Sequence, residues 1–118
     1  MPGGGARSPR SDAAAQAAFR ELVPDDPRVS VRPMFGSVAA FADTQMFMGL
    51  FADELFVRLT ESEREQILAH GGAQLEPMPG RPMKEYVTLA DWRERPDDVR
   101  RWAARSLDYA LSLPPKKK

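Results

Sequence analysis

The chain has 118 residues, 42% of them hydrophobic and 29% charged, and its formal net charge is zero. This composition predicts one soluble globular domain with a single core. The sequence has no cysteine, no apolar run near the roughly 20 residues of a membrane span and no hydrophobic signal region at its start. These absences exclude disulfides and thiolate metal sites and favour a cytoplasmic location.

The first half of the chain is predicted to form a tail, a helix and three strands. Residues 1–10 are rich in Gly, Pro, Arg and Ser and predict a disordered tail. A helix is predicted from a cap at Ser11 to Val23, because proline follows at Pro24. Apolar segments then predict strands over 38–42, 45–52 and 55–59. The second strand is apolar enough to be central, and the turns are short enough for hairpins.

A second helix is predicted after these strands. Thr60 and Glu63 have the spacing of a capping box, in which each side chain accepts a free backbone N–H of the other. The helix is predicted to end at His70 and Gly71, where glycine can adopt the left-handed conformation of a helix cap.

The last part of the chain predicts two more strands and a final helix. The strands are expected over 74–78 and 83–89, and the prolines between them indicate a loose loop and an edge position. A helix is predicted from Pro96, which suits a first helical turn, to Leu113. Residues 114–118 are predicted to be a basic tail.

The resulting prediction is one α+β domain over residues 11–113, with an antiparallel five-stranded sheet and three helices in the order α-β-β-β-α-β-β-α. The strand from Met83 to Leu89 is expected at an exposed edge, where it can pair with a second copy and form a homodimer.

Charge is distributed unevenly along the sequence. All 17 acidic residues lie between Asp12 and Asp108, whereas five of the 17 basic residues lie in the two tails. The body therefore has twelve basic and seventeen acidic side chains, a net charge of −5. Because nucleic-acid affinity comes largely from Lys and Arg on phosphates, direct nucleic-acid binding by this body is not expected.

Several short motifs resemble the amino-terminal domain of the TfoX/Sxy family, over roughly Ala14 to Leu113. They are Met34-Phe35-Gly36, Gly49-Leu50, the strand Leu55 to Leu59, Pro82-Met83 before Tyr86, and Trp102-Ala103. The family takes its name from bacterial competence regulators. The resemblance implies an arrangement similar to the secretion-chaperone-like α+β folds.

The resemblance also implies a coregulator that works through other proteins at promoters, with transcription machinery such as a complex of the cyclic-AMP receptor protein as partner. Two departures accompany it. Ser37 to Phe41 replaces the family's usual glycine and tyrosine. We also expect a stand-alone domain, without the carboxy-terminal helical domain of the full-length regulators.

The residue types that carry most enzyme chemistry are sparse. His70 is the only histidine, and its position at a helix end favours a capping role over a catalytic one. The acidic pairs Asp25-Asp26, Asp53-Glu54 and Asp97-Asp98 fall in predicted turns or first helical turns, where acids solvate loops or complement the helix dipole. We therefore expect no catalytic residue, no metal and no cofactor.

Methionines form the most suggestive cluster. Met34, Met46, Met48, Met78 and Met83 lie on or beside predicted strands. Flexible thioethers suit both irregular cores and adaptable contact surfaces. The core interpretation places them inside. The binding interpretation places a groove beside the sheet edge, and its predicted contact residues are Met34, Phe35, Gly36, Met83 and Tyr86.

Two functional hypotheses follow. The first is a non-catalytic protein-interaction module of the TfoX amino-terminal type. The alternative is a small-molecule-binding protein or an unrecognised enzyme, with a pocket between the sheet and a helix.

Overall fold

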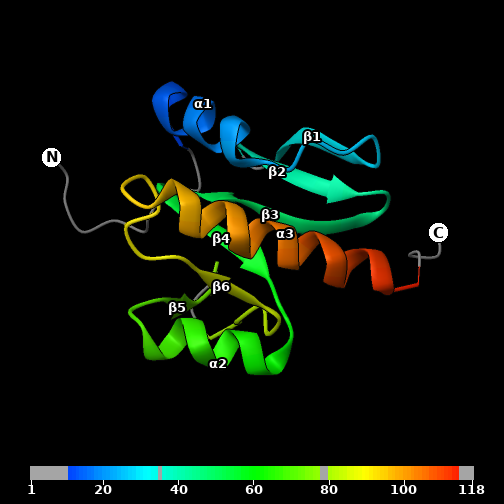
Figure 1. Ribbon diagram of the computed structural model, residues 1–118. Coiled ribbons are helices and arrows are strands. Elements are labelled where there is room, and N and C mark those ends of the chain that lie inside the picture. The colour runs from blue at the N-terminus through cyan, green and yellow to red at the C-terminus, as the bar shows by residue number, and fades with distance from the viewer. Residues whose placement is uncertain (1–10, 35, 78–79, 115–118) are drawn as a thin grey trace, which may run out of the picture.

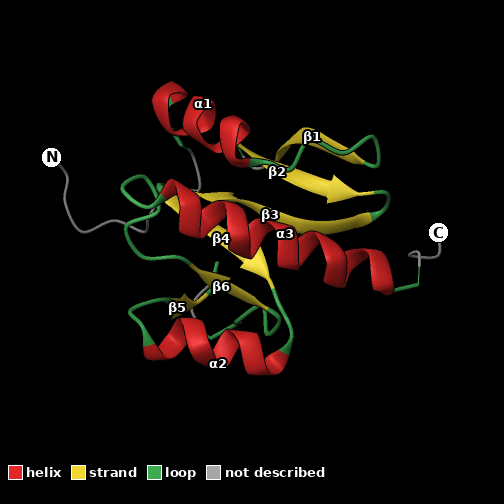
Figure 2. Ribbon diagram, viewed as in Figure 1, coloured by secondary structure: helices red, strands yellow, loops and turns green. Residues whose placement is uncertain are grey.

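The structure, a computed structural model, describes residues 11–34, 36–77 and 80–114, so the predicted tails lie almost entirely outside the described residues. Within these residues it has an α+β fold (Figures 1 and 2). The helices are α1 (Ala13–Leu22), α2 (Glu61–Ala69) and α3 (Pro96–Ser112). The strands are β1 (Val29–Met34), β2 (Ser37–Ala42), β3 (Gln45–Phe51), β4 (Glu54–Arg58), β5 (Ala73–Gln74) and β6 (Tyr86–Thr88).

The strands form one antiparallel sheet in the order β1-β2-β3-β4-β6-β5, which confirms the predicted fold class. The predicted number of five strands is wrong, because β1 was not expected. Its sequence contains Pro33 and exposed polar residues such as Arg32, which argue against a strand. A proline is tolerated on an edge strand, and β1 is the outer neighbour of β2.

The predicted edge at Met83 to Leu89 is also wrong. The strand in this region, β6, is only three residues long and is paired on both sides, with β4 and with β5. The backbone hydrogen-bonding groups of β6 are therefore occupied on both sides. This strand has no free edge for the expected pairing with a second copy of the chain. The outer strands are β1, which contains Pro33, and β5, which has two residues.

The helix ends follow the local sequence, with one correction. Asp12, not Ser11, caps α1, and its Oδ1 accepts the Ala15 N–H at 2.7 Å. The predicted capping box of α2 is present between Thr60 and Glu63. At the other end of α2, Gly71 has a φ of +99°, as the predicted left-handed cap requires.

The core lies between the sheet and the helices. α3 runs across β3 and β4, and α1 packs against α3 and β3 (Figure 1). Residues of both helices join the strands in one apolar cluster, which includes the fully buried Phe19, Phe47, Leu55 and Val99. α2 lies against β5 and β6 at the far end of the sheet. No helix among the described residues has the length and apolar character needed to cross a membrane.

Candidate binding groove on the open face of the sheet

The two faces of the sheet have different surroundings. Successive side chains of a strand point to opposite faces. The cross-strand pair Met48 and Val57 is fully buried in the core cluster under the helices. The next pair, Gly49 and Phe56, therefore lies on the other face, which we call the open face.

The open face contains an apolar groove of about 310 Å³. Each of its lining residues is apolar, and the described helices contribute none of them. We call this cavity the open-face groove. Strands β1 to β4 supply Met34, Val38, Ala39, Met46, Leu50, Phe51 and Phe56, and the β5–β6 segment supplies Leu75, Pro77 and Met83.

Gly49 allows the floor of the groove to form. A Cβ added at Gly49 would lie 2.7 Å from Cζ of Phe56 and 3.1 Å from Cβ of Ala39. The Phe56 ring therefore lies directly over the glycine backbone. The ring is held from the side by Tyr86, whose ring meets it edge-on at 5.6 Å between centroids. The Tyr86 hydroxyl donates to the Met46 carbonyl at 3.0 Å.

The structure brings together part of the predicted contact set. Met34 and Met83, which are 49 positions apart, line the same groove, and Tyr86 contacts its Phe56 wall. Gly36 lies in the β1–β2 turn with a φ of +76° and is not a lining residue. Phe35 lies outside the described residues.

The sequence left open whether the methionines lie in the core or in a binding groove, and the structure places them in both. Met48 is fully buried in the core, whereas Met34, Met46 and Met83 are half-buried and line the open-face groove. Met78 lies outside the described residues. Sequence reasoning missed the contributions of Phe51, Phe56 and Leu75. Period-two alternation around Gly49 is the signal that could have found Phe51, since residues 49 and 51 share a face.

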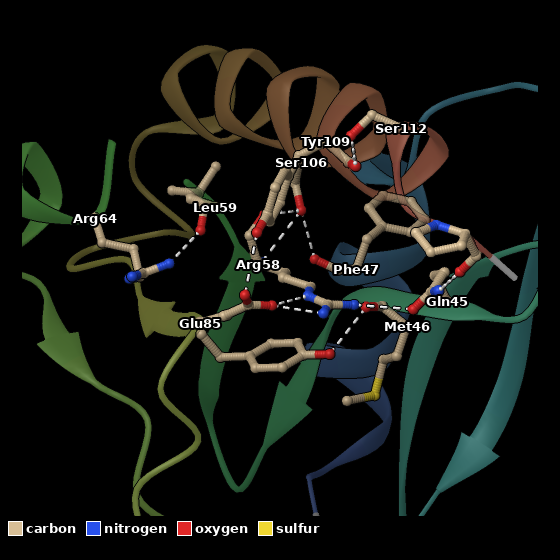
Figure 3. A network of polar contacts seen from close by, with 12 residues as sticks. Gln45, Met46, Phe47, Arg58, Leu59, Arg64, Glu85, Ser106, Tyr109 and Ser112 are labelled. Atoms are coloured by element: carbon tan, nitrogen blue, oxygen red, sulfur yellow. Dashed lines mark hydrogen bonds and ion pairs between the residues drawn. The ribbon is translucent and has the colours of Figure 1, made fainter. Parts of the chain in front are cut away.

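A polar network centred on Arg58 lies beside the groove and joins the sheet to α3 (Figure 3). The Arg58 guanidinium donates to Glu85 through Nε at 2.7 Å and to the Gln45 side chain at 3.0 Å. Tyr109 of α3 donates to the other Glu85 oxygen at 3.1 Å. The Arg58 guanidinium also lies over the rings of Tyr86 and Tyr109. The hydrogen-bonding groups of these side chains are paired with one another, which indicates a structural role for the network.

The network sets the protonation of its members. Partial burial raises the pKa of Glu85, but the hydrogen bonds and charge of Arg58 and the hydrogen bond from Tyr109 outweigh it, so the pKa lies below its ordinary value. Burial raises the pKa of Tyr86. Burial and the neighbouring Glu85 raise the pKa of Tyr109. The cluster therefore favours a charged carboxylate and neutral phenols.

Ser106 of α3 completes the sheet at the point where the β3–β4 ladder stops. The register runs from Phe51 to Met48 on β3, and the next pair would be Phe47 with Arg58. The fully buried Ser106 hydroxyl lies there instead, 2.7 Å from the Phe47 carbonyl and 2.6 Å from the Arg58 carbonyl. It also accepts the Arg58 N–H at 3.2 Å.

A second cavity, of about 320 Å³, lies between α2 and α3. Its lining mixes apolar residues such as Ile67 and Val99 with polar and charged ones such as Arg95 and Asp98. His70 borders it, and its Nδ1 lies 2.7 Å from the Gln66 carbonyl. This contact with the last turn of α2 confirms the predicted capping role of His70.

The predicted acidic pairs have the local contacts expected of turns and helix starts. Asp26 binds Arg28 through both carboxylate oxygens, and hydrogen bonds from Arg28 lower the pKa of Asp26 to about 2. Asp98 pairs with Arg101 at 2.9 Å in the first turns of α3. Within the described ranges, no group of three or more His, Cys, Asp or Glu residues is placed to hold a metal ion.

Together these features define a small α+β domain with one sheet face under helices and one open face that carries an apolar groove. A match to the TfoX N-terminal domain covers residues 21–110 of the 118, and the chain belongs to this family. A comparison with curated proteins finds no match. The family assignment confirms the resemblance inferred from Met34-Phe35-Gly36 and the associated motifs.

Proposed function

We propose that this chain is a non-catalytic protein-interaction domain and that the open-face groove is its contact surface. The observation that supports this proposal most directly is the groove itself, where apolar side chains from four strands and from the β5–β6 connection meet without a described helix over them. Five of its lining residues, the three methionines among them, are half-buried and therefore present part of their apolar surface to solvent. Grouped accessible apolar surface is a common mark of an interaction site. Three flexible methionines suit a surface that adapts to another protein.

The chemistry of the groove favours an apolar side chain of a protein over a metabolite. Metabolite pockets usually combine apolar walls with a few polar groups that fix the orientation of the ligand. The lining of the open-face groove offers apolar side chains alone. The Arg58 network beside the groove is engaged internally through Glu85 and Gln45, which supports a role without catalysis.

By analogy with the family, we propose a cytoplasmic coregulator whose partner belongs to the bacterial transcription machinery. The body of the domain has a net charge of −5, which supports contact with proteins rather than directly with DNA. The absence of cysteine supports a reducing compartment. The family assignment is what points to transcription.

Photo-crosslinking tests the proposal. A photoreactive amino acid at Met83, in the groove, is compared with one at Leu68, an exposed apolar residue on α2 that is 44% exposed. We expect a transcription protein to be crosslinked from Met83 and not from Leu68. In affinity capture without a crosslinking group, the double variant Met46→Gln, Met83→Gln should fail to retain the same protein, whereas Leu68→Gln should retain it. Equal capture by all variants would contradict the proposal.

The second candidate function is small-molecule binding in the cavity between α2 and α3. The observation in its favour is the mixed lining, with an apolar Ile67 and Val99 beside the charged Arg95 and Arg101. A thermal-shift screen with metabolites tests it. A compound that stabilises the wild type and fails to stabilise Arg95→Ala would support this candidate, and a screen without any stabilising compound would count against it.

A further inference from the structure

The charged groups around the open-face groove differ in sign from the rest of the body. Arg32 of β1 pairs in register with the lining residue Ala39, and Arg81 and Lys84 flank the lining residue Met83 in the sequence. All three cationic residues are exposed. They stand on opposite sides of the groove, at β1 and at the β5–β6 segment.

The carboxylates near the groove are fewer. Glu54 pairs in register with the lining residue Phe51, and Glu76 lies between the lining residues Leu75 and Pro77. The Glu76 carboxylate already accepts the Gly80 N–H at 2.6 Å, and Glu54 also has an interaction partner. These three cations and two carboxylates therefore sum to +1, whereas the other charged residues of the body, the paired Arg58 and Glu85 included, sum to −6.

The cations at the groove are available to a partner. Neither Arg81 nor Lys84 forms an ion pair with another described residue. Arg32 lies over the Phe41 ring, 4.4 Å from its centroid, and donates to the Asp43 carbonyl at 3.5 Å, with no carboxylate contact to a described residue. By contrast, Arg100 and Arg101 on α3 each face an aspartate of the same helix.

We propose that the occupant of the open-face groove is a protein segment with apolar anchor residues flanked by aspartate or glutamate. The inference rests on the proposed function and specifies the chemistry of its partner. Apolar anchors match the methionine and phenylalanine lining, and carboxylates beside them match the cations on both sides. At physiological salt, charges further away than about 8 Å are largely screened, so the cations at the groove outweigh the distant acidic groups of the body.

Selection from a phage-displayed library of random 12-residue peptides tests this inference. The whole chain is the target, and Met46→Gln, Met83→Gln is the subtraction target because it makes the lining more polar without changing its charge. We expect the recovered peptides to combine Leu, Met or Phe with a net negative charge. Circular dichroism and thermal melting first establish that each variant is folded.

The recovered peptides are then synthesised and their association rates measured against two charge-reversed variants. Arg81→Glu, Lys84→Glu should lower the association rate about tenfold at low salt and reduce its salt dependence, as changes in rim charge do. The matched control, Arg100→Glu, Arg101→Glu, introduces the same charge on α3 and should leave the rate within about twofold.

Each outcome separates the two proposals. Peptides that need the groove but are neutral or basic, or that bind Arg81→Glu, Lys84→Glu as fast as the wild type, would overturn the acidic partner and leave the interaction domain intact. A library from which every enriched peptide binds Met46→Gln, Met83→Gln equally well would overturn the groove as contact surface, and the inference with it.

Discussion

Single residues decide how the open-face groove and its neighbouring network are built. Gly49 is required by the Phe56 ring above it, and Ser106 is required by a gap in the β3–β4 ladder. The two residues are required for different reasons. At Gly49 there is no room for a side chain, whereas at Ser106 a buried hydrogen-bonding group is needed.

Adding one methyl group at Gly49 should destabilise the domain. In Gly49→Ala the new Cβ would meet Phe56 at 2.7 Å, and Phe56 is only 5% exposed. Overpacking of this type costs about 1–3 kcal/mol, which exceeds the gain of about 0.4–1 kcal/mol from a less flexible unfolded chain. Urea unfolding measures the change. Addition of Phe56→Leu should recover part of the loss, whereas fully additive effects would contradict a direct clash.

Removal of the Ser106 hydroxyl should lower the unfolding free energy by more than the loss of one small group would suggest. Ser106→Ala leaves the buried Phe47 carbonyl and the part-buried Arg58 carbonyl without the hydroxyl near both, and an unsatisfied buried group costs about 1–3 kcal/mol. Ser112→Ala is the matched control, because its exposed hydroxyl bonds only the Tyr109 carbonyl among the described residues. That control should change the unfolding free energy by less than about 0.5 kcal/mol. Equal effects at both positions would argue against the bridging role.

At the scale of elements, α2 depends on its ends more than on its buried face. Of its nine residues, only Ile67 is classed as buried, and Leu68 is 44% exposed. The helix is therefore stabilised chiefly by the capping box at Thr60 and by the glycines after His70. A helix with so little packing is expected to be sensitive to changes in its caps.

Thr60→Ala should weaken α2 selectively. The Thr60 hydroxyl accepts the Glu63 N–H, and the Glu63 carboxylate accepts the Thr60 N–H. Loss of such a cap costs about 1 kcal/mol. Hydrogen exchange should become faster in residues 61–69 than in α3, and Thr60→Ser should restore the wild-type rate. Uniformly faster exchange throughout the sheet would instead indicate that α2 does not open on its own.

At the scale of the whole molecule, the Arg58 network links β4, the β5–β6 segment and α3, so its titration acts on global stability. The pKa of Glu85 is lower in the folded protein than its ordinary value of 4.5. A carboxyl of this type stabilises the folded state above its ordinary pKa and loses that contribution as the pH falls through the folded-state pKa.

The unfolding free energy should therefore fall as the pH drops below about 4.5, and Glu85→Gln should show a shallower fall. The difference should be about 1 kcal/mol or less, because the Glu85 side chain is 38% exposed. Urea unfolding between pH 3 and 7 measures it. Glu21→Gln, at an exposed position on α1, controls for the loss of one negative charge. An identical pH dependence in both variants would contradict a coupled Glu85.

Much of the fold could be predicted because local signals agreed with the final structure. The capping box at Thr60, the cap at Gly71 and the apolar run of β3 each specify their element within a few residues. β1 could not be predicted in the same way. Its sequence includes Pro33 and exposed polar residues, and only its place at the edge of the sheet makes such a strand acceptable.

The candidate site was predictable only in part. Its methionine character and two of its members, Met34 and Met83, could be proposed from composition and position, whereas Leu75 and Phe56 join them because β6 brings its connection back alongside β4. The separation of the core Met48 from the groove-lining Met46 depends on an irregular register between β2 and β3, near Ala40 and Phe41. The alternation of apolar and polar residues in the sequence does not predict such a register shift.

By itself, then, the sequence determined the fold class, the caps of α2 and the family, because these depend on residues close together in the chain. Tertiary structure alone decided the sixth strand, the paired state of β6 and the collection of distant apolar residues into one groove. The physical reason is that strand order and face assignment are set by pairing between segments far apart in sequence, where a shift of one residue exchanges the two faces.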